Sequence, residues 1–205
     1  MSIFTEFLLH PRTTGAVAAS SRGLARALTD GLDLRHARTV VELGPGTGAV
    51  TDAILRRVGP DTRVVAVELN GHLAKSLRQR YHEKPITIVH GSAADLATLV
   101  TGPVDAVVSG LPWTVLPTPM RHRILDAVTA VLTPAGRFTT FAYVHAAWTP
   151  PARRFAAELA ERFAVVERTP WVPANLPPAF VHRAILTDPR QPAHQGVHVA
   201  VERLG

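Results

Sequence analysis

Short apolar runs alternate along the chain with segments in which apolar residues recur at helical spacing. The runs are rich in valine, isoleucine and alanine and are bounded by glycine, proline or polar residues, a pattern typical of β-strands. Strands are expected from Thr39 to the glycine turn at Gly44, and at Arg63–Val67, Ile86–His90, Val104–Ser109, Arg137–Tyr143, Ala164–Pro170 and Ala179–Leu186. Helices are expected at about Ala49–Val58, Gly71–Arg80, Ala93–Leu99, Thr118–Leu132 and Pro151–Phe163.

This alternation predicts an α/β fold in which a doubly wound, mostly parallel sheet carries helices on both faces. Thr133-Pro134-Ala135-Gly136 is expected to end one helix and turn the chain into the next strand. The last two strands are joined by a proline-rich loop, Val172–Pro178, with no helix between them. They therefore predict an antiparallel closing hairpin on a seven-stranded, Rossmann-like sheet.

Length and composition fit one compact α/β domain. The chain has 205 residues, which is enough to bury a full core, and it contains no cysteine for a disulfide or a thiolate site. No apolar run is long enough to span a membrane, and the start lacks signal-peptide character, so a cytoplasmic protein is expected. We divide it into an N-terminal helical segment (1–32), a core (33–186) and a tail (187–205), in which an edge strand Val197–Val201 is one possibility.

The charge balance favours an anionic partner. The formal net charge is +6, and arginine supplies nearly all of the positive charge because the only lysines are Lys75 and Lys84. Nucleic acid and an anionic lipid surface both fit this charge, which does not choose between them.

The most informative stretch is Thr39–Val50, which reads Thr-Val-Val-Glu-Leu-Gly-Pro-Gly-Thr-Gly-Ala-Val. An apolar strand leads into a glycine-rich turn that opens a helix, an arrangement that lets backbone amides approach a nucleotide-like ligand. The triplet Gly44, Gly46 and Gly48 also satisfies a dinucleotide-binding pattern, so the turn alone does not identify the ligand.

Two carboxylates frame this turn. Glu68 ends the second strand, just before Leu69, where an acid can accept hydrogen bonds from both ribose hydroxyls. Glu42, inside the first strand, has no such role in a nicotinamide enzyme, whereas Glu42-x-Gly44-x-Gly46-x-Gly48 resembles the motif of class I methyltransferases that use S-adenosylmethionine. The competing structural interpretation makes Glu42 a surface strand residue and Glu68 a helix N-cap.

Two further strand ends complete the predicted site. After the third strand, methyltransferases often carry an aspartate that contacts adenine, and here Ser92 with the backbone of Ala93 takes that place. Asp95 is interpreted as an acid that favours the positive end of a helix. The fourth strand ends in Ser109-Gly110-Leu111-Pro112-Trp113, which is similar to the substrate motif of amine methyltransferases. Trp113 is expected to face the substrate, with a cap over the core as the alternative.

With these motifs the chain resembles two related groups, the ribosomal RNA adenine dimethyltransferases and the bacterial phospholipid N-methyltransferases. The stretch 7–21 and the loop 175–181 resemble the lipid enzymes, as does serine in place of asparagine at the start of the fourth-strand motif. No helical domain of the kind found in the RNA enzymes is expected after the sheet. The resemblance covers residues 3 to about 186 and implies S-adenosylmethionine as cofactor and phosphatidylethanolamine, or its methylated products, as substrate. It places Thr14 and Gly15 near the cofactor.

The N-terminal segment has a physical interpretation as well. Apolar residues at positions 3, 4, 7 and 8 form one face of a short helix, and Arg12 follows, with Arg22 and Arg26 on the next helix. Such a helix can bind reversibly to an anionic membrane surface at the inner face of the membrane, with arginines pairing lipid phosphates. It can equally pack on the sheet as a lid over the cofactor.

Methyl transfer to an amine requires that the amine lose its proton first. The candidate proton acceptors are Tyr143, His145, His10 and His182. Leu111, Pro112, Trp113, Arg12 and His182 are the expected substrate contacts, and no metal is expected. An RNA adenine methyltransferase, a small-molecule methyltransferase and a binding module without activity remain open alternatives. The sequence does not indicate an oligomeric state.

Overall fold

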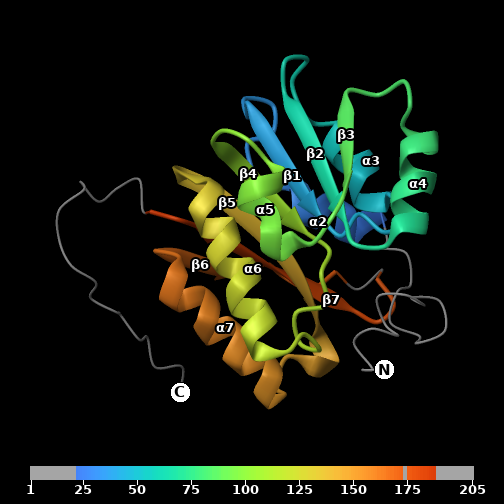
Figure 1. Ribbon diagram of the computed structural model, residues 1–205. Coiled ribbons are helices and arrows are strands. Elements are labelled where there is room, and N and C mark those ends of the chain that lie inside the picture. Colours follow the sequence, from blue (N-terminus) through green and yellow to red (C-terminus); the bar gives the residue numbers. More distant parts are fainter. Residues whose placement is uncertain (1–21, 173–174, 188–205) are drawn as a thin grey trace.

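A computed structural model describes residues 22–172 and 175–187 of the chain. Its centre is a seven-stranded sheet with the order β3-β2-β1-β4-β5-β7-β6 (Figure 1). The strands that run in one direction are β1 (Thr39–Leu43), β2 (Arg63–Glu68), β3 (Ile86–His90), β4 (Val104–Ser109), β5 (Leu132–Tyr143) and β6 (Val165–Arg168); β7 (Ala179–Ile185) runs antiparallel between β5 and β6. The predicted α/β fold with an antiparallel closing hairpin is confirmed.

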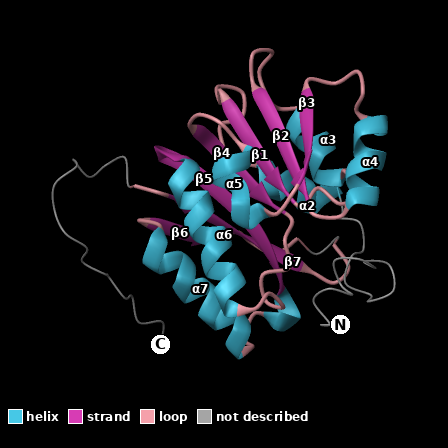
Figure 2. Ribbon diagram, viewed as in Figure 1, coloured by secondary structure: helices cyan, strands magenta, loops and turns pink. Residues whose placement is uncertain are grey.

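Helices cover both faces of the sheet (Figure 2). On one face α5 (Leu96–Leu99), α6 (Thr118–Val131) and α7 (Pro150–Arg162) bury apolar side chains against the strands. On the other face lie α2 (Arg22–Thr29), α3 (Ala49–Leu55) and α4 (Gly71–Arg80). Because both faces are covered, all five residues of β1 are buried, which explains why the parallel strands read as continuous apolar runs. No helix in the described part is long and apolar enough to cross a membrane.

The structure shifts several predicted boundaries. The expected turn at Thr133–Gly136 is part of β5, which begins directly after α6 and pairs with β4 through a register shift between Val104 and Ala106. This irregularity accommodates proline and glycine inside a strand that is paired on both sides. The first-motif helix α3 ends at Leu55 rather than near Val58, and β6 is shorter than expected at both ends.

Candidate functional site

The glycine turn lies at the carboxyl end of β1, beside the end of β4, where successive connections leave the sheet in opposite directions. Ligands bind at such switch points of open α/β sheets. The amide of Gly44 donates to Val67 O at 2.9 Å, and the amide of Gly110 donates to Leu43 O at 2.8 Å. These bonds join the turn to β2 and to the fourth-strand motif, so the two predicted motifs lie side by side.

Gly110 makes this approach possible. A β-carbon at position 110 would lie 2.7 Å from Gly44 O, so any other residue would push the two loops apart. The side chain of Leu111 lies over Gly44 and covers the turn. The proposed substrate motif and the proposed cofactor motif therefore share one packed contact.

Glu68 lies at the end of β2 and is only 7% exposed. Its Oε2 accepts a hydrogen bond from Gly46 N at 3.1 Å, and its Oε1 accepts one from Asn70 N at 2.9 Å. Each oxygen retains a lone pair for a further donor, so the carboxylate can accept a ribose diol beside the glycine turn. The N-cap alternative for Glu68 is wrong, because Asn70 caps α4 through bonds to the amides of His72 and Leu73.

Glu42 is buried, with 1% of its surface exposed, and accepts a hydrogen bond from Thr51 Oγ1 at 2.6 Å. The interpretation of Glu42 as a surface residue is therefore wrong. Burial raises the pKa of Glu42 to about 8, and the charges of Glu68 and Asp52 add to this rise, while the hydrogen bond from Thr51 opposes it. At neutral pH the side chain is mostly an uncharged acid beneath the glycine turn.

Two residues at the end of α4, Arg80 and Tyr81, hold the glycine turn, and no motif in the sequence reveals this brace. Tyr81 Oη lies 2.9 Å from Gly48 O and 2.7 Å from Asp52 Oδ1, and burial followed by the bond to Asp52 raises the pKa of Tyr81. Arg80 donates to Thr47 O at 2.7 Å and to Asp52 Oδ2 at 2.6 Å. Gly48 itself has a φ of 90°, a left-handed conformation that favours glycine. The end of α4 therefore fixes two carbonyl groups of the turn.

The fourth-strand motif is held together by Ser109. Its Oγ accepts hydrogen bonds from Trp113 Nε1 at 3.0 Å and from Leu111 N at 3.3 Å, and the residue is fully buried. Ser109 thus braces the motif, which corrects its expected role as a direct cofactor contact. Pro112 O accepts a hydrogen bond from Val115 N, which closes a turn between the fourth-strand motif and α6.

Trp113 is a core residue, which corrects the expectation that it faces the substrate. It is 2% exposed, stacks on Phe155 at 4.9 Å between ring centroids, and meets Phe138 edge to face at 5.9 Å. The alternative of a cap over the core is the correct one. Its packing attaches the fourth-strand motif to α7 and to β5.

His182 is also buried, with 3% exposure, between Phe155 and Phe180. Burial, followed by the positive charge of Arg168, lowers its pKa to about 4. Such a ring does not face a substrate and does not accept a proton near neutral pH. Both expectations for His182 are therefore corrected.

Two other candidate proton acceptors lie at the carboxyl end of β5. The ring of Tyr143 stacks on that of His145 at 5.7 Å, and burial raises the pKa of Tyr143. A raised pKa leaves even less of Tyr143 as the tyrosinate that could accept a proton at neutral pH. His145 is exposed. Their catalytic roles stay predictions.

The third strand end offers a polar group at the same edge. Ser92 and Ala93 are half-buried, and Ser92 Oγ accepts a hydrogen bond from Ala94 N at 3.2 Å, which leaves its hydroxyl proton for a ligand. Asp95 forms no side-chain capping bond to α5 and instead lies 3.4 Å from Arg123. Leu69, 46% exposed, follows Glu68. Contacts of Ser92, Ala93 and Leu69 with a cofactor stay predictions.

Several predicted residues lie outside the described part of the chain. They are His10, Arg12, Thr14, Gly15, the apolar face at residues 3–8 and the suggested strand Val197–Val201. Of the basic residues named with that segment, Arg22 and Arg26 do lie on α2, as expected.

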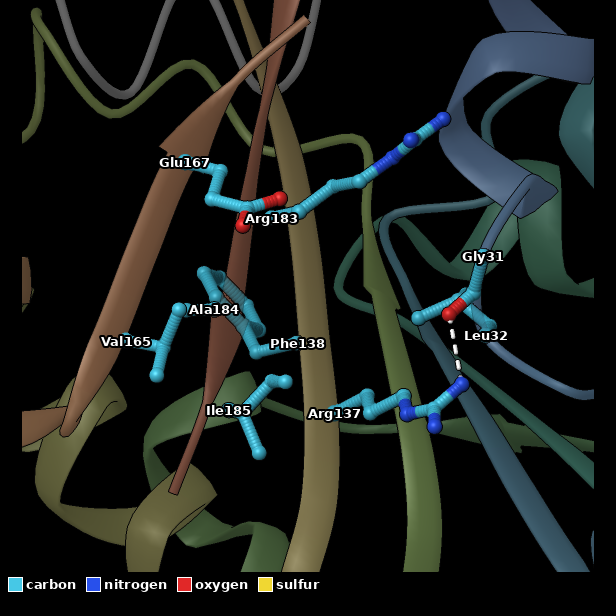
Figure 3. A pocket seen from close by; sticks show the side chains of 9 residues that line it. All are labelled: Gly31, Leu32, Arg137, Phe138, Val165, Glu167, Arg183, Ala184 and Ile185. Carbon is cyan, nitrogen blue, oxygen red and sulfur yellow. Dashed lines mark hydrogen bonds between the residues drawn. The ribbon is translucent and has the colours of Figure 1, made fainter. Parts of the chain in front are cut away.

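A pocket at the opposite edge of the sheet does not belong to this site (Figure 3). It lies near the start of β5, where Arg137 Nη1 donates to Gly31 O at 2.7 Å. Arg183 lines it from β7 and donates through Nη2 to Ala27 O at 3.3 Å. These bonds connect Gly31 to β5 and Ala27 of α2 to β7, away from the glycine turn.

Comparisons with known proteins agree with this geometry. Residues 40–136 match the family described as methyltransferase domain. A protein of Singulisphaera acidiphila named ornithine lipid N-methyltransferase is 33% identical over 179 residues, which cover 85% of this chain and 89% of that protein. Ribosomal RNA small subunit methyltransferase A of Acidobacterium capsulatum is 35% identical over 97 residues, and these cover 45% of this chain and 33% of that protein.

Solved structures show the same fold. The O-methyltransferase TomG of Streptomyces achromogenes, determined in complex with S-adenosylmethionine, superposes with a TM-score of 0.63 and 24% sequence identity. The match covers 84% of this chain and 82% of that protein. At this identity the likeness establishes the architecture.

Proposed function

Because this chain belongs to the S-adenosylmethionine-dependent methyltransferases, we propose that it methylates the amine of a membrane lipid headgroup. The observation that carries this proposal is the likeness to a relative named ornithine lipid N-methyltransferase, which extends over nearly the whole of both chains. An ornithine headgroup is the first acceptor to test, and phosphatidylethanolamine, which the resemblance of the motifs implies, is the second.

The arrangement of the site supports cofactor binding. Bound S-adenosylmethionine would supply an activated methyl group on a sulfonium, so the protein itself needs only to align donor and acceptor. Glu68 would accept the ribose hydroxyls, and the amides of the glycine turn would approach the rest of the ligand. Leu111 and Pro112, braced by Ser109, would line the place where the amine enters.

The acceptor amine must reach this place without its proton. Among the described candidates, His182 is buried with a lowered pKa and Tyr143 has a raised one. The exposed His145 or solvent is therefore the proposed route for the proton. We further propose that the enzyme acts at the cytoplasmic face of the membrane as a peripheral protein, with an anionic lipid surface as its partner.

An RNA adenine methyltransferase is the second candidate. The specific observation in its favour is the identity of about a third to several enzymes named ribosomal RNA small subunit methyltransferase A. This chain spans only about a third of the length of those enzymes, and the match covers about half of this chain.

Transfer of labelled methyl from S-adenosylmethionine tests the proposal directly. Ornithine lipid, phosphatidylethanolamine and unmodified ribosomal RNA are offered in parallel to wild type and to Glu68→Gln. We expect label in the lipid fraction with wild type and a large loss with Glu68→Gln, while the exposed control Asp61→Asn keeps activity. Label in RNA alone would overturn the lipid assignment, and absence of label from all three would point to another acceptor.

A further inference from the structure

Apart from Leu69 after β2, the large apolar side chains that the described residues leave exposed lie in loops after β4, after β5 and between β6 and β7. Val115 is 51% exposed, Trp148 83%, Trp171 67% and Leu176 78%. Val115 follows β4, Trp148 follows β5, and the other two lie in the loop between β6 and β7. We call these four residues the apolar rim.

The loops that carry the rim are tied to one another. Val144 N donates to Pro178 O at 2.9 Å, which joins the loop after β5 to the loop before β7. The stacked rings of Trp113 and Phe155 join the loop after β4 to α7. Figure 1 shows these loops at the lower right end of the sheet, where β5 ends and β7 begins. The rim is therefore one surface beside the predicted methyl-transfer site.

The loops around the rim carry no acidic residues. Residues 110–117, 144–154 and 169–178 contain no aspartate or glutamate. Arg153 and Arg154, both exposed, follow Trp148 in the first turn of α7. An exposed apolar patch next to arginines, with no acid to repel an anion, is complementary to an anionic lipid surface.

The two tryptophans of the apolar rim also favour a lipid bilayer as its binding partner. Tryptophan combines a large apolar ring with a polar N–H and is enriched where a protein meets the headgroup region of a bilayer. A lipid substrate also presents its headgroup at the bilayer surface, so an enzyme without a described membrane-spanning helix must bring its site to that surface.

From these observations we propose that the apolar rim inserts into the headgroup region of an anionic bilayer and holds the carboxyl edge of the sheet against it. Trp148 and Trp171 provide the inserted rings, and Arg153 and Arg154 pair with lipid phosphates. This orientation would bring the loop that carries Leu111 and Pro112 to the lipid surface. This inference rests on the proposed lipid function and assigns the contact to loops of the folded core.

Tryptophan fluorescence of the full chain tests the insertion without any substitution. Trp113 is buried, so quenching by brominated lipids reports on Trp148 and Trp171. With vesicles of phosphatidylcholine and phosphatidylglycerol we expect clear quenching, and with Trp148→Phe/Trp171→Phe we expect it to disappear. Wild-type protein that binds these vesicles without quenching would overturn the proposal.

Cosedimentation with the same vesicles measures the contribution of each part. We expect Trp148→Ser/Trp171→Ser to bind at least about tenfold more weakly, a change that corresponds to about 1.4 kcal/mol. Arg153→Glu/Arg154→Glu should weaken binding more than Arg35→Glu/Arg56→Glu, which makes the same charge change at exposed positions of the opposite edge. Unchanged vesicle binding of the serine variant, with cofactor affinity retained, would refute the rim.

These assays separate the rim from the proposed function. The vesicles contain no aminolipid, so binding is measured independently of methyl transfer. A wild type that methylates no aminolipid would defeat the proposed function, whatever its vesicle binding. A serine variant that loses vesicle binding but still methylates a short-chain, water-soluble aminolipid would support both proposals.

Discussion

Replacing Glu42 by glutamine should stabilise the protein increasingly as pH rises from 5 to 8. Burial raises the pKa of Glu42 from 4.5 to about 8, so the folded state holds a proton that the unfolded state releases in this range. The stability of wild type therefore falls with rising pH through this group, whereas glutamine does not titrate. At about 1.4 kcal/mol per pKa unit, the advantage of Glu42→Gln should grow by roughly 2–4 kcal/mol between pH 5 and pH 8.

Urea unfolding at pH 5, 6, 7 and 8 measures this difference, because titrations of groups that do not interact with Glu42 cancel when variant and wild type are compared. Asp61→Asn is the matched control, because it makes the same change of carboxyl to amide at an exposed position. Any fixed effect of the amide on the bond from Thr51 shifts the curve without changing its slope. A Glu42→Gln difference that is flat across this range would refute the argument for a buried, neutral carboxyl group.

Three further outcomes follow from the site and its supports. Glu68→Gln should weaken S-adenosylmethionine binding by about 10- to 100-fold in calorimetry, because a charge-assisted hydrogen bond contributes ~1.5–3 kcal/mol, and unchanged affinity would contradict the ribose role. Gly48→Ala should lower the free energy of unfolding by about 2 kcal/mol or more, since the left-handed backbone and the Tyr81 hydroxyl both oppose a β-carbon; a loss equal to that of an ordinary surface substitution would argue against it. Arg121→Met should lower the free energy of unfolding in urea by ~3–5 kcal/mol, because buried Glu158 loses the arginine that lies 2.6 Å away. The double variant Arg121→Met/Glu158→Leu removes both charges and should recover part of this loss.

The fold was predictable because its central strands, β1, β2 and β4, are mostly buried on both faces. A continuous apolar run such as β1 predicts a buried parallel strand. Two strands joined by a loop without a helix predict an antiparallel hairpin. The start of β5 was not predictable, since Pro134 and Gly136 have the local signature of a turn. Pairing with β4 and β7 overrides that signature, and pairing between distant strands is not visible in a local window.

Part of the candidate site was also predictable from the sequence, and part was not. The position of Glu68 beside the glycine turn followed from strand ends that meet at one edge of the sheet. The wrong expectation for Trp113 arose because its burial depends on Phe138 and Phe155, which arrive from other elements. The brace of Tyr81 on Asp52 joins side chains 29 residues apart and carries no motif that would reveal it.

Two of the buried ionisable groups, Glu42 and His182, add little charge to the interior at neutral pH. Glu42 is mostly protonated at neutral pH, and His182 is neutral because its pKa is about 4. An incoming ammonium group finds in these two residues neither a buried anion that would hold it charged nor a base that would take its proton. If the chain methylates an amine, as proposed, solvent or the exposed ring of His145 is then the proposed acceptor of the proton. Neither group therefore opposes the neutral amine, which is the form that would attack a methyl group in the proposed reaction.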